Sequence, residues 1–316
     1  MTGKAKYVLK KDVIHSVPIV DITRTKFDAL QNARSILTAA FEIEETYEVM
    51  ITNYVDLEKQ ALNTSATYMV RALMEYSEIF LERVALNARF INLFTATKMY
   101  VDQIPRYARD CIGGGEEELG KFQKMFSITY DEVIEYRFIE ALRNHVQHYG
   151  LPVHSLMFDS SWTSLGEDGL MEHSTRPFCM REYFEQNAKF KKCVLNECEE
   201  KIDLLYMTRR YIEALSEIQC KVREYIETTV NAARLCIEDE IERYSKFHTG
   251  ALVGLCAMKL QDDSVVEKAY LTLEWDNIRQ KLQKRNPQIV NLKKRFVSSS
   301  TKSERSRITD YHKNKP

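Results

Sequence analysis

The chain has 316 residues, a length that accommodates two ordinary domains or one large one. Apolar residues make up 44% and charged residues 29%, with a net charge of −1, which is an ordinary globular balance that can bury a sizeable core. Only 10 glycines and 6 prolines are present. This scarcity argues against a loop-rich or all-β fold, because turns favour both residues.

Signals for other compartments are weak in this sequence. The longest apolar run, 251–258, is too short to cross a bilayer, and no apolar signal segment follows the basic N-terminus. Seven cysteines, an odd number without a C-x-x-C pair, favour reduced thiols. We therefore expect a cytoplasmic protein with no membrane partner. The spacing of the cysteines and carboxylates matches no metal site, so no metal or cofactor is expected.

Long intervals without glycine or proline divide the chain into four helix-rich blocks: 24–104, 116–149, 181–247 and 265–285. Strands would need turns every 8–12 residues or so, and these blocks offer few turn residues. The first block must hold more than one helix, and its polar stretch 63–67 is the predicted break. The predicted fold class is therefore all-α: a multi-helix bundle with a long charged C-terminal helical block and a basic tail.

The predicted organisation has four parts. Residues 1–155 form a helical bundle, and 156–180 an irregular connector with room for a short hairpin. Residues 181–280 form a C-terminal helical region, either packed on the same bundle or extended as an arm or coiled-coil-like hairpin. The tail, 281–316, has 11 Lys/Arg and 2 Asp/Glu, a net charge of +9, and is expected to be partly disordered. It is interpreted either as an arm that contacts phosphates or as a solvated basic tail.

The segment 128–150 carries the most chemically informative pattern. A capping box at 129–132 and a stop at Gly150 predict one helix of five or six turns. On a helical wheel, the apolar side chains share one face. The opposite, polar face carries the side chains suited to chemistry: Arg143, Asn144, Gln147 and His148. His145 lies at the apolar margin, so His148 is the better-placed histidine for a polar groove. His154, just beyond this helix, is interpreted as a loop histidine, and Glu75 or Glu78 is a candidate carboxylate near Arg143.

Arg143 and His148 point about 140° apart on this wheel. One copy of the helix therefore cannot form a tight acid–base pair with an anion holder. Two copies across a two-fold axis could do so, because each ligand atom would then meet residues from both chains. The sequence thus predicts a homodimer.

The run from Arg143 to His148 resembles the R-x4-6-H motif of the HEPN superfamily, all-helical domains found in toxins and antiviral nucleases. Asn144 matches the polar residue that often follows the arginine, and Tyr149 matches the aromatic residue near the histidine. The wider pattern over 136–153 is most similar to uncharacterised bacterial HEPN-like proteins. The resemblance covers about 25 residues and implies that 1–155 is a HEPN-like bundle.

The resemblance implies a metal-independent endoribonuclease in a toxin or phage-defence setting, with RNA as substrate and an antitoxin or defence protein as a possible partner. The RNA 2′-OH would attack the adjacent phosphate. His148 would move a proton, Arg143 would stabilise the phosphorane, and Asn144 would orient one of them, with Gln147 and Tyr149 in support. The alternative is a non-catalytic helical scaffold that binds a partner protein or nucleic acid. A third hypothesis makes Tyr149 the acceptor for a nucleotidyltransferase partner.

Overall fold

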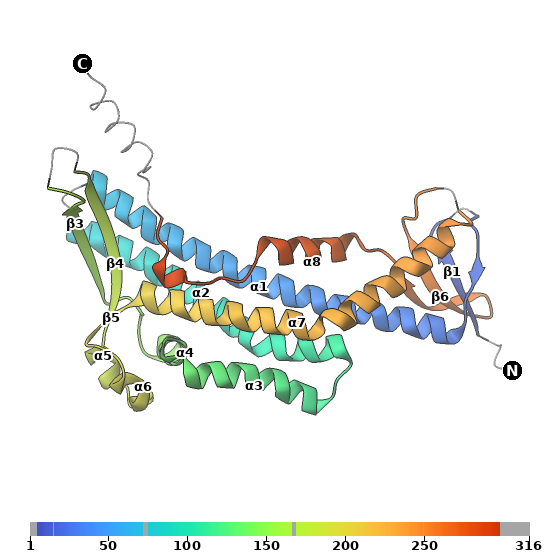
Figure 1. The fold of residues 1–316 in the computed structure, drawn as a ribbon, viewed down its shortest axis with the longest axis horizontal. Coiled ribbons are helices and arrows are strands. Elements are labelled where there is room, and N and C mark those ends of the chain that lie inside the picture. The colour runs from blue at the N-terminus through green and yellow to red at the C-terminus, as the bar shows by residue number, and fades with distance from the viewer. Residues whose placement is uncertain (1–4, 15, 72–74, 166–168, 249, 298–316) are drawn as a thin grey trace, which may run out of the picture.

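The protein is an elongated rod with a small antiparallel sheet at each end (Figure 1). The computed structural model describes residues 5–14, 16–71, 75–165, 169–248 and 250–297. Three long helices run along the rod: α1 (Arg24–Val70), α2 (Tyr76–Ile112) and α7 (Leu204–Ser245). Shorter helices complete it: α3 (Glu116–Glu132), α4 (Ile134–His148), α5 (Glu182–Glu185), α6 (Lys192–Asn196), α8 (Glu274–Arg285) and the 3-10 turn η1 (Leu292–Lys294).

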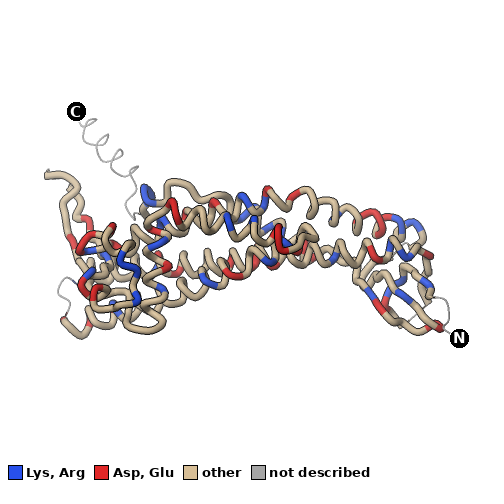
Figure 2. Tube along the Cα trace, turned by 90° about the horizontal axis from the view of Figure 1, so that it is seen from below, with Lys and Arg blue, Asp and Glu red and all other residues tan. Residues whose placement is uncertain are grey.

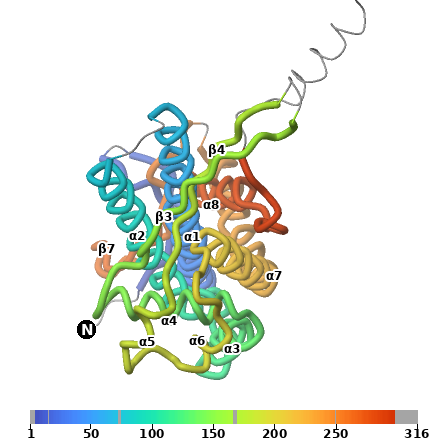
Figure 3. The backbone as a smooth tube through the Cα atoms, turned by 90° about the vertical axis from the view of Figure 1, so that its left-hand side faces the viewer, coloured from blue at the N-terminus to red at the C-terminus, as the bar shows by residue number. Residues whose placement is uncertain are grey.

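The two sheets are formed from segments far apart in the sequence. One sheet has the order β2-β1-β6-β7, from strands β1 (Lys6–Lys11), β2 (Val20–Asp21), β6 (Leu255–Gln261) and β7 (Ser264–Tyr270). The other has the order β3-β4-β5, from β3 (Ser155–Trp162), β4 (Met171–Met180) and β5 (Lys201–Asp203). Every strand pair is antiparallel. In Figure 3, β3 and β4 extend from the bundle at the end that also holds α4, α5 and α6.

The prediction of an all-α fold is wrong. Helices do dominate, at 64% against 15% strand, but both sheets are well formed. The β6–β7 turn shows why the positions of glycine and proline led to a wrong prediction of helix in this region. Asp262 and Asp263 form a two-residue turn with φ of 49° and 63°, a left-handed conformation that aspartate tolerates. The hairpin therefore needs no glycine, and the predicted helical block 265–285 contains a strand followed by α8.

The first helix is longer than the sequence indicated. Thr23 caps it by accepting a hydrogen bond from the Lys26 amide at 3.1 Å. The predicted break at 63–67 is absent, since α1 continues to Val70. The hydroxyls of Ser65 and Thr67 donate to backbone carbonyls four residues earlier, so this polar stretch remains compatible with a helix.

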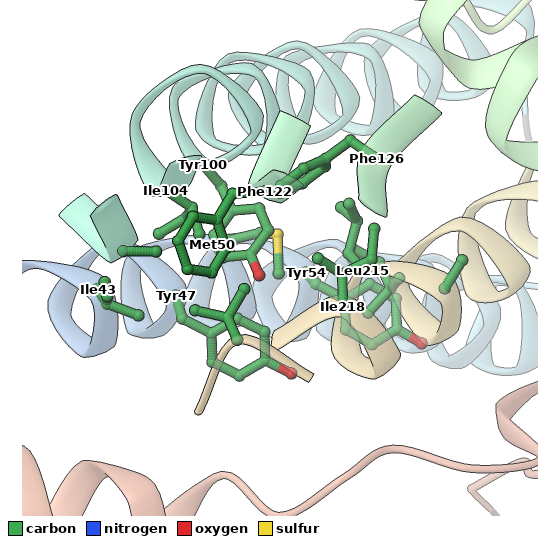
Figure 4. Packing of buried hydrophobic residues seen from close by; sticks show 14 of the residues in the cluster. Ile43, Tyr47, Met50, Tyr54, Tyr100, Ile104, Phe122, Phe126, Leu215 and Ile218 are labelled. Atoms are coloured by element: carbon green, nitrogen blue, oxygen red, sulfur yellow. The ribbon is translucent and has the colours of Figure 1, made fainter. Parts of the chain in front are cut away.

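Aromatic side chains fill the centre of the rod between α1, α2, α3 and α7 (Figure 4). The rings of Tyr47 and Tyr100 lie 5.7 Å apart, and the Tyr100 hydroxyl donates to Gln219 at 2.9 Å. A buried ion pair also joins α1 to α7: Arg223 donates to both carboxylate oxygens of Glu44, at 2.9 and 2.6 Å. This paired geometry satisfies both charges inside the bundle.

The surface of the rod mixes basic and acidic residues along its length (Figure 2). Among the helices that the structure describes, none has both the length and the apolar character needed to cross a bilayer. Of the basic tail, 298–316 lies outside the described residues, while 281–285 belong to α8.

Candidate functional site

The motif lies on α4, a short helix viewed along its axis in Figure 1, which therefore crosses the rod. The prediction of one helix over 128–150 is wrong, because Val133 is extended (φ −114°, ψ 108°) and separates α3 from α4. The Thr129 hydroxyl donates to the Met125 carbonyl within α3, so it does not cap the motif helix. The end of the helix is close to the prediction: α4 ends at His148, where the Tyr149 amide donates to the His145 carbonyl.

Arg143 is buried, with 8% of its surface exposed, although the wheel placed it on the polar face. Its guanidinium donates to the Glu140 carboxylate at 3.2 Å, and the Tyr211 hydroxyl on α7 donates to the same carboxylate at 2.6 Å. Its Nε has no hydrogen-bond partner among the described residues. Because α7 packs on this side of α4, the buried arc is wider than the apolar residues indicate and includes Arg143. Glu78, one of the two carboxylates predicted near Arg143, forms its ion pair with Arg71 instead.

The other motif residues are exposed: Asn144, Gln147, His148 and Tyr149. Three of them, Asn144, His148 and Tyr149, line a groove of about 300 Å³, whereas Gln147 lies outside its lining. The segment after α5 also lines this groove, with Lys189 and Lys191. We call this the motif groove. The structure thus brings His148 and Asn144 together with two lysines but does not place Arg143 in that groove.

His145, which the wheel set at the apolar margin, is 5% exposed and also lines the motif groove. The side-chain Nδ2 of Asn187 lies 3.0 Å from His145 Nδ1. The side-chain Oδ1 of Asn187 accepts from the backbone amide of Lys189 at 2.9 Å. This arrangement makes Nδ1 the acceptor, so a neutral His145 carries its proton on Nε2. Burial lowers the pKa of His145, which favours that neutral form.

A second hollow of about 500 Å³ adjoins the motif groove and shares His145, Tyr149 and Asn187 with it. We call it the side cavity. Its lining also includes Arg83 of α2, His154 from the chain after α4, Tyr183 of α5 and Gln186, which follows α5. We call these two neighbouring hollows together the trough. No local pattern in the sequence indicates Arg83 or Tyr183, because only the folded chain brings α2 and α5 beside α4.

Three cations that line the trough have no ion-pair partner among the described residues, whereas Glu140, which also lines the motif groove, pairs with Arg143. Within the described part of the chain, Arg83, Lys189 and Lys191 have no carboxylate at ion-pair distance, whereas nearby Arg137 pairs with Glu197 at 2.7 Å. The Lys191 ammonium lies 4.7 Å from the Tyr130 ring centroid and donates to the hydroxyl of that ring. Unpaired cations along one trough attract an anionic ligand.

His154 has a structural role at the rim of the side cavity. Its Nδ1 accepts from the Met180 amide at 3.0 Å, and its backbone amide donates to the Phe178 carbonyl at 2.9 Å. Both contacts attach the chain after α4 to β4. Burial lowers the pKa of His154 to about 4, from an ordinary 6.5.

Acid is therefore expected to weaken the fold. The unfolded chain takes up the His154 proton near pH 6.5, whereas the folded chain resists it until about pH 4, so stability falls between these values. His145 acts in the same direction. Urea unfolding at several pH values from about 7 to about 4 should show a smaller loss for His154→Gln, which keeps an acceptor but does not titrate. Equal losses in the variant and the parent protein would refute this role.

Among the residues that the structure describes, no group of three or more His, Cys, Asp and Glu side chains is arranged to hold a metal ion. Comparisons of the chain with protein-family models, with curated proteins and with solved structures found no match. The trough at α4 is therefore the feature from which a function for this protein has to be inferred.

Proposed function

We propose that the trough binds single-stranded RNA and that the motif groove cleaves it by attack of the 2′-hydroxyl on the adjacent phosphate, without a metal ion. The observation that carries the proposal is the composition of the motif groove: an exposed imidazole, His148, lines the same hollow as Lys189 and Lys191, which have no ion-pair partner among the described residues. An imidazole can accept and return a proton near neutral pH, and lysines attract phosphate. Exposed aromatic rings beside cations are typical of single-strand binding sites.

In the proposed reaction, His148 accepts the proton of the ribose 2′-hydroxyl. The 2′-oxygen forms a bond to phosphorus, and the bond from phosphorus to the next 5′-oxygen breaks. That 5′-oxygen receives a proton from solvent water, which leaves a 2′,3′-cyclic phosphate and a 5′-hydroxyl as products, and His148 returns its proton to solvent. Lys189 and Lys191 stabilise the negative charge that develops on the phosphoryl oxygens, and Asn144 donates to one of them.

This proposal differs from the sequence-based hypothesis in the role of the arginine. Arg143 binds Glu140 inside the protein, so the lysines of the segment after α5 take the part of anion holder. His145, which is buried, adds a second imidazole to the lining of the same groove, and its Nε2–H can donate a hydrogen bond. Since all these groups belong to one chain, the proposed reaction does not depend on a second subunit.

The lysines provide the direct test of RNA binding. Each phosphate neutralised on single-stranded RNA contributes about 0.7 to the slope of log affinity against log salt concentration. Lys189→Ala and Lys191→Ala are each expected to weaken RNA binding and to reduce this slope by about that amount. Fluorescence anisotropy of a labelled single-stranded RNA, titrated at several salt concentrations with EDTA present, measures both effects.

Lys246→Ala is the matched control, because this exposed lysine directly follows α7 at the opposite end of the rod. It should leave affinity and slope unchanged. If all three variants behave alike, the motif groove is not where the phosphates bind, and the proposal fails.

A further inference from the structure

The side cavity has a lining that the cleavage chemistry does not use. It shares His145, Tyr149 and Asn187 with the lining of the motif groove, so the two hollows are neighbours. We therefore expect a base next to a phosphate held in the groove to reach the cavity. Its volume, about 500 Å³, falls in the range of small-ligand pockets. The inference below rests on the proposed function, since it concerns the base next to the phosphate held there.

Two tyrosines offer ring faces in this cavity. Tyr149 and Tyr183 are each 51% exposed. Each is supported from one side by a histidine ring: Tyr149 stacks with His145 at 5.7 Å, and Tyr183 lies 4.3 Å from the ring of His154. A supported but half-exposed ring is suited to stacking with an unpaired base.

The polar part of the lining includes two groups with free hydrogen-bond donors, Arg83 and His145. The guanidinium of Arg83 lies 5.6 Å from the Phe80 ring and donates one weak bond, 3.4 Å long, to the His154 carbonyl. A guanidinium has five N–H donors, so Arg83 keeps donors for a ligand. His145 adds its Nε2–H, and the absence of a side chain at Gly150 leaves room there, since a Cβ would lie 3.3 Å from that nitrogen.

We propose that the side cavity is a subsite for one unpaired guanine base of the RNA. Guanine presents two neighbouring acceptors, N7 and O6, which match a guanidinium fork. Adenine places an amino donor beside N7, and pyrimidines have no N7, so both fit a donor-rich wall less well. In this arrangement Arg83 reads the edge of the base, and Tyr183 stacks on its face.

The test uses the full-length protein and 2′-O-methyl RNA oligomers of about eight nucleotides. These oligomers cannot be cleaved, because the 2′-oxygen carries no hydrogen. A uridine strand with one central guanine is compared with strands that carry adenine or 7-deazaguanine at that position. Fluorescence anisotropy should give about 10-fold tighter binding for guanine than for adenine, with 7-deazaguanine in between, since it lacks only N7.

Two variants connect the preference to the cavity. Arg83→Ala should remove the difference between guanine and 7-deazaguanine, and Tyr183→Ala should weaken binding of every strand by about 5-fold or more. Arg106→Ala controls for loss of one positive charge over an aromatic ring, and Tyr225→Ala controls for loss of a half-exposed tyrosine packed on a ring. Neither control should change the preference.

The outcomes separate this inference from the proposed function. Equal affinity for guanine and adenine, or a preference that survives Arg83→Ala, overturns the guanine subsite while leaving salt-dependent RNA binding in place. Absence of binding to every strand overturns both proposals.

Discussion

Replacing His148 by alanine is expected to slow RNA cleavage by about 10²- to 10⁴-fold, the usual contribution of a positioned acid–base group. The fold should be unchanged, because this side chain is exposed at the end of α4. End-labelled single-stranded RNA, incubated with the protein in the presence of EDTA and resolved on a sequencing gel, measures the rate. The proposed chemistry requires products that end in 2′,3′-cyclic phosphate or 3′-phosphate.

His173→Ala is the matched control for this experiment. His173 lies on β4, where its ring contacts Ser160, and it does not line the motif groove. Its substitution should leave the rate unchanged. Cleavage by His148→Ala at the parental rate would remove His148 from the mechanism. RNA that is bound but never cut by the parent protein would instead favour a non-catalytic RNA-binding scaffold.

The second large effect concerns stability. Arg143→Ala is expected to destabilise the protein by about 3 kcal/mol, because it removes one partner of a buried ion pair and leaves the Glu140 carboxylate with only the Tyr211 hydroxyl. Chemical denaturation followed by circular dichroism measures this loss. Since Arg143 lines neither hollow, its removal takes away no phosphate contact, and the salt dependence of RNA binding should remain that of the parent protein.

A double-mutant cycle distinguishes a structural from a substrate-binding arginine. If Arg143 acts through Glu140, the double variant Arg143→Ala/Glu140→Ala should lose much less free energy of unfolding than the sum of the losses in the two single variants. A guanidinium that contacts RNA would give the opposite pattern: little change in stability and a salt slope reduced by about 0.7. That result would return Arg143 to the role that the motif resemblance implies.

The sequence was informative where local rules apply. It predicted a helix that ends near Gly150, and it placed Asn144, Gln147 and His148 on an exposed face, as the structure has them. Hydrophobic periodicity reports the exposed centre of a helix well, because those residues contact only solvent. It does not report burial by neighbouring elements. Arg143, which the wheel placed on the polar face, and His145, which it placed at the apolar margin, are both buried.

The sheets illustrate the same limit over longer distances. Strand β1 pairs with β6 across almost the whole length of the chain, and no local pattern specifies that partner. The turn at Asp262–Asp263 is local, but it is formed by aspartates, whereas the prediction of turns depended on glycine and proline. The all-α prediction failed for these two reasons.

By itself, the amino-acid sequence determined that this protein is largely helical and that an imidazole and an amide share the exposed side of one short helix, because spacing along a helix sets which side chains lie together. Only the tertiary structure decided which side chains from other elements line the same hollows. Side chains from other elements line the trough: Lys189, Lys191, Arg83 and Tyr183. Arg143 is buried, pairs with Glu140 and lines neither hollow. The physical reason is that a binding site is formed by surfaces that meet on folding, and the chemistry of each surface is visible in the sequence while their meeting is not.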